Sequence, residues 1–188
     1  MRTIKQFLLL CLITLSFPAL AQDDGKYKFS LEPLYGLETS YVRFPSPGKY
    51  VTRATYGLRA IYGLTLLSGE VEVTQAHSSQ NYSGDRKVED KTQNLALGVR
   101  STYAMGRYLG FYLRAGGRAT QGESKVTEAG VTETHDNPLK VNPYGGAGLQ
   151  IAFSNIMALN LGATLIKNGE GKYDSQFTFG LTTQFGRF

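Results

Sequence analysis

The chain has 188 residues and a formal net charge of +5, with 22 glycines, 12 tyrosines and one cysteine. This length fits one domain, and the charge is too low and too scattered for a nucleic-acid-binding surface. Because the only cysteine, Cys11, lies in an N-terminal apolar run, the rest of the chain has no thiol for a disulfide, a thiolate metal site or a cysteine nucleophile.

Residues 1–21 predict a secretory signal peptide, which is cleaved from the mature chain. Arg2 and Lys5 precede a short apolar run, and small residues stand at the expected cleavage site before Gln22. Leu10 precedes Cys11 where a lipoprotein cleavage box has a small residue, so we do not expect a lipid anchor there. The predicted domain, residues 22–188, contains no apolar run long enough to cross a bilayer as a helix.

Segments in which apolar and polar residues alternate follow one another through this domain. Such alternation predicts strands with one apolar face. The predicted strands cover residues 27–38, 52–62, 66–77, 94–103, 109–118, 141–153, 157–165 and 176–188. Pro33 cannot donate a backbone hydrogen bond, so it predicts a bulge or another irregularity in the first strand.

Long polar segments and short turns alternate between the predicted strands. We interpret the long segments as loops, and they cover residues 44–50, 78–91, 121–140 and 167–175. The short turns fall near residues 63–65, 104–107 and 154–156. This layout is typical of outer-membrane barrels, which have long outer loops and short periplasmic turns. The predicted strands also fit the span of about 9 to 11 residues that a tilted strand needs to cross the hydrocarbon.

The last predicted strand, QFTFGLTTQFGRF, has one apolar face and ends at Phe188. It resembles the closing strand of bacterial outer-membrane β-barrels, whose C-terminal aromatic residue is read by the barrel-assembly machinery. Phe185 and Phe188 are therefore the candidate assembly signal, with Gly186 where the family usually has a second aromatic residue.

Residues 22–188 as a whole resemble the eight-stranded outer-membrane β-barrel family of the OmpA, OmpX and OmpW type. The resemblance lies in the pattern and layout of the segments, not in one motif. It implies an all-β fold, namely an eight-stranded antiparallel transmembrane up-and-down β-barrel. It also implies a place in the outer membrane of a Gram-negative bacterium, with both termini in the periplasm.

A soluble eight-stranded barrel such as a lipocalin is the alternative fold, and it would turn its apolar face inward. The polar faces here are rich in Gly, Asn and Gln with charges in mid-strand, and the apolar faces are nearly continuous, which favours lipid contact. We therefore expect Leu97, Leu161 and Phe179 to face lipid. Aromatic residues near the strand ends are expected to form the two interfacial girdles: Tyr27, Tyr56, Tyr62, Tyr103 and Phe153.

The polar faces bring a set of charged residues into the expected lumen: Arg59, Glu70, Glu72, Arg100, Arg114 and Arg118. Side chains fill an eight-stranded barrel, and buried charges have to pair. We predict a plug of ion pairs, completed by Asn94, Tyr112, Asn142, Tyr144, Gln150 and Asn160. The alternative is a narrow, gated channel lined by the same residues.

One arrangement hints at catalysis. His77 and Ser79, with an acidic residue such as Glu89, are similar to the His-x-Ser pair of the outer-membrane lipid A deacylase family, in which the His would activate the Ser. The flanking residues do not otherwise match that family, so a solvated histidine is the preferred interpretation. His135 and Asp136 are adjacent, but two ligands do not make a metal site. We predict no catalytic, cofactor-binding or metal-binding residues.

The favoured function is that of a non-enzymatic envelope or surface protein that presents loops for adhesion or partner binding. The expected partners are outer-membrane lipid, the barrel-assembly machinery, an extracellular partner, and lipopolysaccharide, whose phosphates would meet Arg86, Lys87 and Lys91. No nucleic acid is expected. The alternatives are a narrow channel or a carrier of small hydrophobic molecules, as the OmpW-type resemblance implies, and a lipid A-modifying enzyme.

Overall fold

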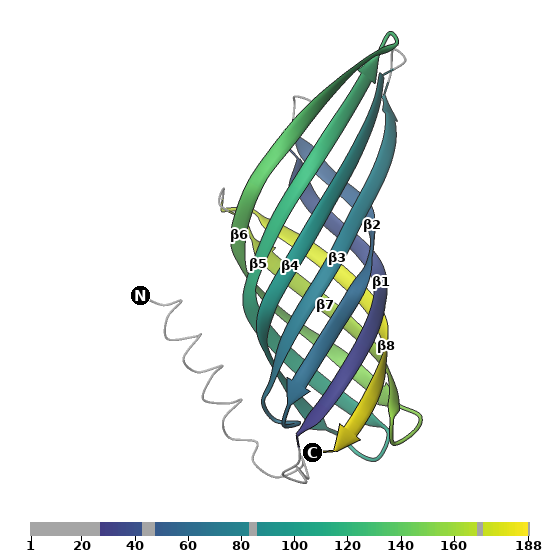
Figure 1. Ribbon diagram of the computed structural model, residues 1–188, viewed down its shortest axis with the longest axis vertical. Coiled ribbons are helices and arrows are strands. Elements are labelled where there is room, and N and C mark those ends of the chain that lie inside the picture. The colour runs from purple at the N-terminus through teal and green to yellow at the C-terminus, as the bar shows by residue number, and fades with distance from the viewer. Residues whose placement is uncertain (1–26, 43–47, 83–85, 169–170, 188) are drawn as a thin grey trace.

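The computed structural model describes residues 27–42, 48–82, 86–168 and 171–187, and they form one closed barrel of antiparallel strands (Figure 1). The predicted signal peptide and Phe188 lie outside the described residues. The eight strands are β1 (Lys28–Val42), β2 (Lys49–Gly63), β3 (Ser68–Tyr82), β4 (Arg86–Ala104), β5 (Leu109–Glu128), β6 (Val131–Ala152), β7 (Met157–Lys167) and β8 (Tyr173–Arg187). The predicted strand number and up-and-down topology are confirmed.

Each strand pairs with its neighbours in sequence, and β1 pairs with β8 to close the ring. Closure matters because lipid offers no partner for a free backbone amide. The register of β1 with β8 is the same before Pro33, at Leu31↔Thr183, and after it, at Leu34↔Gly180. No bulge forms at Pro33, but Glu32 and Pro33 have no register partners on β8, which is an interruption of the kind expected from the missing donor; the register shift itself falls between Lys28 and Phe29.

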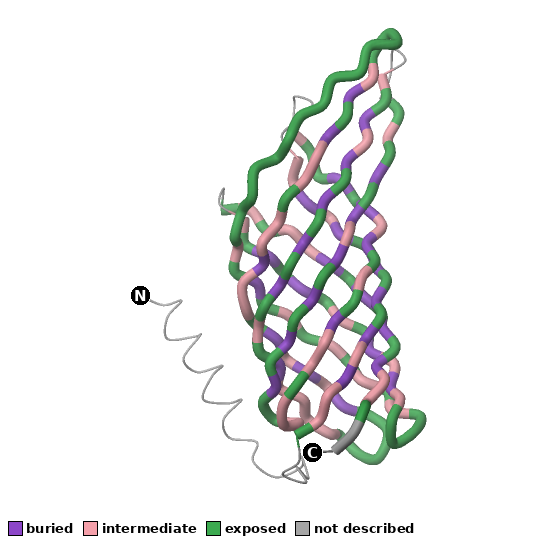
Figure 2. Tube along the Cα trace, in the orientation of Figure 1, coloured by how far each residue is buried: buried purple, intermediate pink, exposed green. Residues whose placement is uncertain are grey.

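Burial alternates along most strands, as the banded trace in Figure 2 shows. At the buried positions, polar side chains point into the barrel, whereas at the alternate positions large apolar side chains are exposed on its outer surface. Leu97, Leu161 and Phe179 are 55%, 43% and 50% exposed. A soluble barrel would bury these residues, so the apolar face is the outer one. The described part of the chain contains no helix long and apolar enough to cross a bilayer.

On β3, β4 and β5 the outer face changes from apolar to polar toward the upper end. Across β3, β4, β5 and β6 the highest apolar row consists of Val73, Leu95, Ala119 and Val141, which are register partners. Two residues further up, a row of glutamines takes their place on the outer face: Gln75, Gln93 and Gln121.

The segments 78–91 and 121–140, which we expected to be loops, are mostly strand. β3 runs on to Tyr82, β4 begins at Arg86, and β5 and β6 meet at a two-residue turn, Ala129–Gly130. Much of the alternation persists above the membrane, because Val88 and Val126 point inward and are buried. The outward positions there carry charged and polar side chains instead of apolar ones, so a search for an apolar face interprets them as loop.

These extensions form a projecting sheet, defined here as residues 78–82, 86–91, 122–128 and 131–143 of β3 to β6. The β2–β3 pairing reaches up to Ala54↔His77, and the β6–β7 pairing reaches up to Tyr144↔Ile166. Above these pairs the four strands rise past the rest of the rim (Figure 1). Residues 131–143 of β6 are therefore an open edge, paired with β5 on one side and with no strand of the described chain on the other.

Candidate functional site

The polar lumen is the candidate site, and the strand register assembles it. Glu32, Arg59 and Glu72 are register partners on β1, β2 and β3, and all three point inward. Opposite charges thus face each other in one row. Arg59 is fully buried, so its charge has to be met by other side chains.

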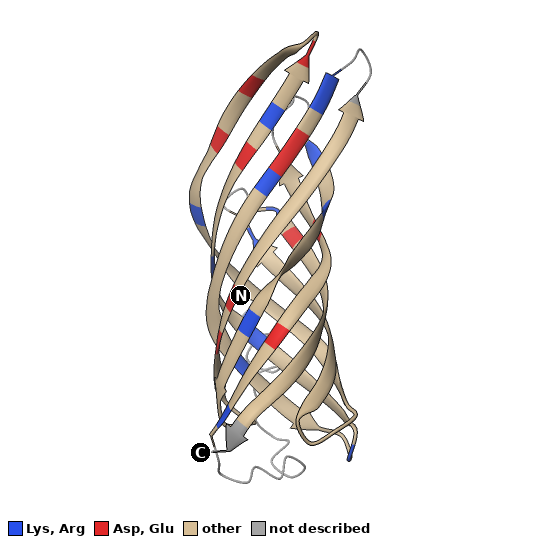
Figure 3. Ribbon diagram, turned by 45° about the vertical axis from the view of Figure 1, so that its right-hand side comes forward, with Lys and Arg blue, Asp and Glu red and all other residues tan. Residues whose placement is uncertain are grey.

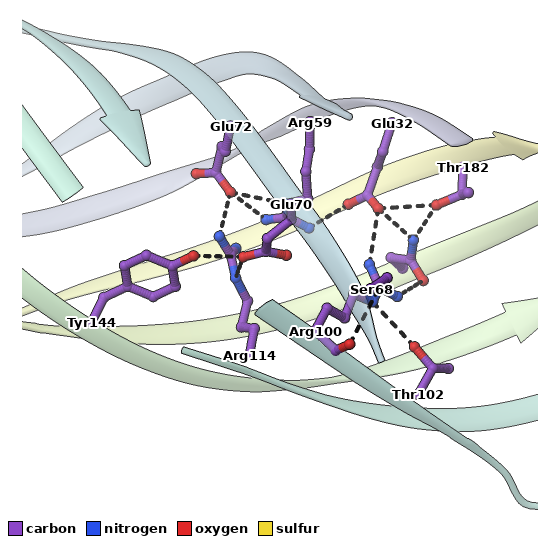
Figure 4. Close-up of polar contacts among 11 residues, drawn as sticks. Glu32, Arg59, Ser68, Glu70, Glu72, Arg100, Thr102, Arg114, Tyr144 and Thr182 are labelled. Carbon is purple, nitrogen blue, oxygen red and sulfur yellow. Dashed lines mark hydrogen bonds and ion pairs between the residues drawn. The ribbon is translucent and has the colours of Figure 1, made fainter. Parts of the chain in front are cut away.

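Arg59 and Arg114 hold the centre of the lumen (Figure 4). Arg59 donates to Glu72 Oε2 from Nε at 2.9 Å and from Nη2 at 2.7 Å, and to Glu32 Oε1 from Nη1 at 2.7 Å. Arg114 crosses from β5 and donates to Glu72 Oε2 at 2.8 Å and to Glu70 Oε1 at 2.7 Å. Two guanidiniums therefore share one carboxylate, and the ion pairs span the bore.

Arg100 extends the same network toward the lower end. It donates to Glu32 Oε2 and to Asn160 Oδ1, both at 3.4 Å. Asn160 and Thr182 in turn donate to Glu32 Oε2 at 2.7 and 2.9 Å. The central plug, defined as Glu32, Arg59, Glu70, Glu72, Arg100 and Arg114, contains equal numbers of acidic and basic groups and is neutral.

Two tyrosines fill the space that the ions leave. The Tyr144 hydroxyl donates to Glu70 Oε1 at 2.6 Å, and the Arg114 guanidinium lies 4.9 Å from the Tyr144 ring centre. Arg100 stacks on Tyr112 at 3.7 Å. The Tyr112 ring lies against Gly148 and Gly162, where a Cβ atom would collide with it. The inward glycines make room for the inward tyrosines.

A second cluster lies above the plug. Arg118 donates to Glu38, and Arg53 Nη1 lies 3.9 Å from Glu38 Oε1 and donates to Thr92 at 3.0 Å. Asn94 Nδ2 lies 3.4 Å from the same carboxylate as a donor. Here two guanidiniums meet a single carboxylate.

The lumen is hollow above and below the plug. An upper cavity of about 570 Å³ extends from Arg118 and Asn142 to the rim residues Asn168 and Asp174. A lower cavity of about 170 Å³ is lined by Ser68, Arg100 and Gln150 among others. The charged plug separates the two spaces.

The structure brings Arg59, Glu70, Glu72, Arg100 and Arg114 into the central plug and places Arg118 in the cluster above it. Asn94, Tyr112, Tyr144 and Asn160 join these networks, whereas Asn142 and Gln150 line the cavities. Sequence reasoning missed three members, Glu32, Glu38 and Arg53. Glu32 and Glu38 could have been found, because both lie on the polar face of the first predicted strand, which points into the lumen.

Aromatic rings are paired on the outer surface. Tyr27 stacks on Tyr62, and Tyr103 on Phe111, near the lower end of the barrel. Tyr56 does not lie near a strand end as expected; it stands in the middle of β2, opposite Tyr35. The reason is that β2 continues above the apolar belt.

His77 and Ser79 lie on the outer face of β3 above the glutamine row, and Glu89 is the register partner of Ser79 on β4. The Glu89 carboxylate binds Lys87 Nζ at 2.6 Å, and this hydrogen bond holds the pKa of Glu89 below its usual value. Glu89 is thus engaged by Lys87. His135 lies 3.6 Å from Glu133, and among the described residues no three His, Cys, Asp or Glu side chains are grouped to hold a metal ion.

A closed barrel of eight antiparallel strands with an apolar belt and a lumen filled by paired charges is the structure of an outer-membrane β-barrel protein. The sequence agrees. Residues 7–185 match the family described as outer membrane protein beta-barrel domain, and the chain belongs to this family. It is a protein of the cell outer membrane, and in this family the short-turn end faces the periplasm.

Solved structures share the fold at low sequence identity. Ail, the attachment invasion locus protein of Yersinia pestis, has a TM-score of 0.59 at 16% identity, over 86% of this chain and 99% of that chain. Neisserial surface protein A has a TM-score of 0.57 at 14% identity, over 87% and 99%. OprG from Pseudomonas aeruginosa has a TM-score of 0.56 at 8% identity, over 86% and 96%. No curated protein matches the sequence.

Proposed function

We propose that this protein is a non-enzymatic surface protein whose projecting sheet binds an extracellular partner. The observation that carries the proposal is the open edge of β6, residues 131–143, which continues upward past the apolar row at Val141 and has no neighbouring strand among the described residues. Open edges offer a row of unpaired amides and carbonyls to a strand from another protein.

The upper part of this edge is suited to pairing. Residues 131–137 contain no proline, whereas Pro138 and Pro143 interrupt the lower part. In this upper part Val131 is 66% exposed, and Leu139, just below it, is 65% exposed. Exposed apolar side chains along an open edge give a partner strand both main-chain and side-chain contacts.

Charge does not favour a polyanion as the partner. Acidic and basic residues are mixed over the projecting sheet (Figure 3), and several of them pair with each other, as Lys87 does with Glu89 and Lys125 with Glu123. Ail has been solved in complex with the heparin analogue sucrose octasulfate. For this chain, main-chain pairing with a protein strand is the better supported mode.

A substitution at one edge residue tests the proposal. In an antiparallel pair every second residue directs its N–H away from the partner strand. Val131, which follows the two-residue turn at Ala129–Gly130, directs its N–H toward β5, so Thr134, three residues further along, directs its N–H away from β5. Bacteria that display the wild-type protein should adhere to cultured epithelial cells more than bacteria with an empty vector. Thr134→Pro should reduce adhesion to the vector level, because proline removes the donor.

Thr134→Val is the matched control, since it changes the side chain and keeps the backbone N–H. It should adhere like the wild type. Adhesion of the wild type at the vector level, or full adhesion by Thr134→Pro, would contradict the proposal. Equal surface amounts of the variants, measured on intact cells, are needed for the comparison.

We propose three further assignments for this protein. Residues 1–21 act as a cleaved signal peptide before a barrel of residues 22–188. Phe185 and Phe188 serve as the assembly signal. The ring centre of Phe185 lies 6.2 Å from that of Phe29. Lys91, exposed just above the glutamine row, meets lipopolysaccharide phosphates, for which its position at the top of the apolar belt is suited.

A further inference from the structure

The upper cavity has a different charge balance from the plug beneath it. Its ionic lining consists of the carboxylates Glu38 and Asp174, the cations Arg53, Arg118 and Lys140, and His135. Three permanent cations thus face two carboxylates, whereas the central plug is neutral. Arg53 and Arg118 are buried in the hollow, whereas Lys140 is an exposed residue of its wall.

The two arginines are incompletely satisfied. Both are more than nine-tenths buried. Arg118 bonds Glu38 through Nη2, but its Nε and Nη1 have no hydrogen-bond partner among the described residues, and the same is true of Arg53 Nε. Buried donors without partners are costly, and a guanidinium presents its donors in a fork that fits oxyanions.

Asp174 does not supply the missing acceptor. Its Oδ1 accepts a hydrogen bond from the Tyr41 backbone N–H at 3.0 Å, which fixes the carboxylate at the rim. Asn137 and Asn142 add neutral amides to the wall, so the cavity combines cations with groups that hydrogen-bond hydroxyls.

The cavity has a route to the outside and a useful size. Its lining includes Tyr41, Val42 and Asn168 at the upper ends of β1 and β7, on the lower side of the rim. A volume of about 570 Å³ falls within the range of small-molecule sites and exceeds what one inorganic ion needs.

We infer that the upper cavity binds a monosaccharide-sized oxyanion, with its anionic group toward Arg53, Arg118 and Lys140 and its hydroxyls toward the asparagines. The cavity shares His135 and Lys140 with the open edge of β6, but Thr134, whose substitution tests the proposed function, does not line it, so the two experiments can fail separately.

The test uses the mature full chain, refolded in detergent micelles without lipopolysaccharide and titrated by calorimetry. The probe is glucose 6-sulfate, and glucose is its neutral counterpart. Glucose 6-sulfate should bind with saturation and glucose should not. Arg118→Gln should weaken binding about tenfold, the usual effect of one charged hydrogen bond.

Heat-modifiable migration on a gel shows whether Arg118→Gln folds. If it does not fold, two other variants test whether the cavity binds the oxyanion. Lys140→Gln changes an exposed residue and should weaken binding several-fold, and Asp174→Asn should tighten it. Lys125→Gln, an exposed lysine outside the cavity, is the matched control and should leave the affinity unchanged. Equal responses to glucose and glucose 6-sulfate, or no effect of Lys140→Gln and Asp174→Asn, would show a cavity filled only by water.

Repeating the titration in nanodiscs that contain lipopolysaccharide identifies the source of the oxyanion. An unchanged affinity assigns the cavity to a free solute. A weakened affinity shows that lipid phosphates compete for the same arginines.

Discussion

Arg59 and Glu72 face each other directly across the β2–β3 pair, and the guanidinium donates to one carboxylate oxygen through both Nε and Nη2. The same oxygen also accepts from Arg114. Neighbouring residues on β2 and β3 thus hold a side chain that crosses the lumen from β5. The same ion pairs therefore stabilise the barrel and close its bore.

Arg59→Gln should lower the free energy of unfolding by about 3 to 5 kcal/mol, because it leaves Glu32 and Glu72 buried without their main cation. Urea-induced unfolding in lipid vesicles measures the change. Lys125→Gln, which removes an exposed cation paired with Glu123, should change it by less than about 0.5 kcal/mol. Equal stability of the two variants would mean that the plug does not stabilise the barrel.

The wild-type protein should give no steady conductance in planar bilayers and no uptake of sugars in a liposome swelling assay. The physical reason is the plug, which separates the two cavities with ion pairs as short as 2.7 Å. Vesicles with a general porin provide the positive control. Steady wild-type conductance would favour the narrow-channel alternative.

Two glycines of β6 should respond in opposite ways to alanine. A Cβ at Gly148 would collide with the Tyr112 ring and the Leu161 carbonyl, so Gly148→Ala should destabilise the barrel by about 1 to 3 kcal/mol. A Cβ at Gly145 meets nothing within 4 Å, so Gly145→Ala should be neutral or slightly stabilising. Unfolding in vesicles compares the two, and a larger loss for Gly145→Ala would be the contrary result.

Ser79→Ala should leave the acylation of lipid A unchanged in cells that express the protein, as read by mass spectrometry. The expectation rests on Glu89, whose carboxylate is bound to Lys87 instead of orienting a catalytic His77. Lipid A that lacks an acyl chain in wild-type cells, and regains it with Ser79→Ala, would establish the deacylase alternative.

Binding of glucose 6-sulfate should tighten as the pH falls from neutral. Burial raises the pKa of the Asp174 carboxyl, which lies at the upper end of β8, so this group becomes neutral at a higher pH than an ordinary aspartate and removes a negative charge from the cavity. Asp174→Asn should reduce the pH dependence. His135 lines the same cavity, so the profile is also measured in a His135→Gln background, in which Glu38, Arg53, Arg118, Lys140 and Asp174 are all retained. A flat pH profile for His135→Gln would contradict the role of Asp174.

The membrane-spanning part of the fold could be predicted because lipid imposes period-two alternation on every strand. Outside the membrane this requirement ends, and the charged outer positions near Lys87 and Glu123 made the projecting sheet resemble loops. These segments are recognised as strands by their backbone pairing across β3 to β6. That pairing cannot be inferred from the alternation of apolar and polar residues.

The site was partly predictable for a related reason. Parity assigned Arg59, Glu72 and Arg100 to the lumen, but it cannot say which inward groups touch across the bore. Arg100 on β4 reaches Asn160 on β7, and Arg118 on β5 reaches Glu38 on β1. Such contacts depend on barrel diameter and side-chain reach, which the local sequence does not encode.

The turn at Ala129–Gly130 also makes the chain a practical display scaffold. Both residues have positive φ, and the turn caps a hairpin whose strands continue for about 20 Å above the glutamine row. A foreign peptide spliced in at this tip would be carried clear of the bilayer and far from the lumen, so an epitope or a capture tag could be exhibited on living bacteria while the barrel beneath still assembles.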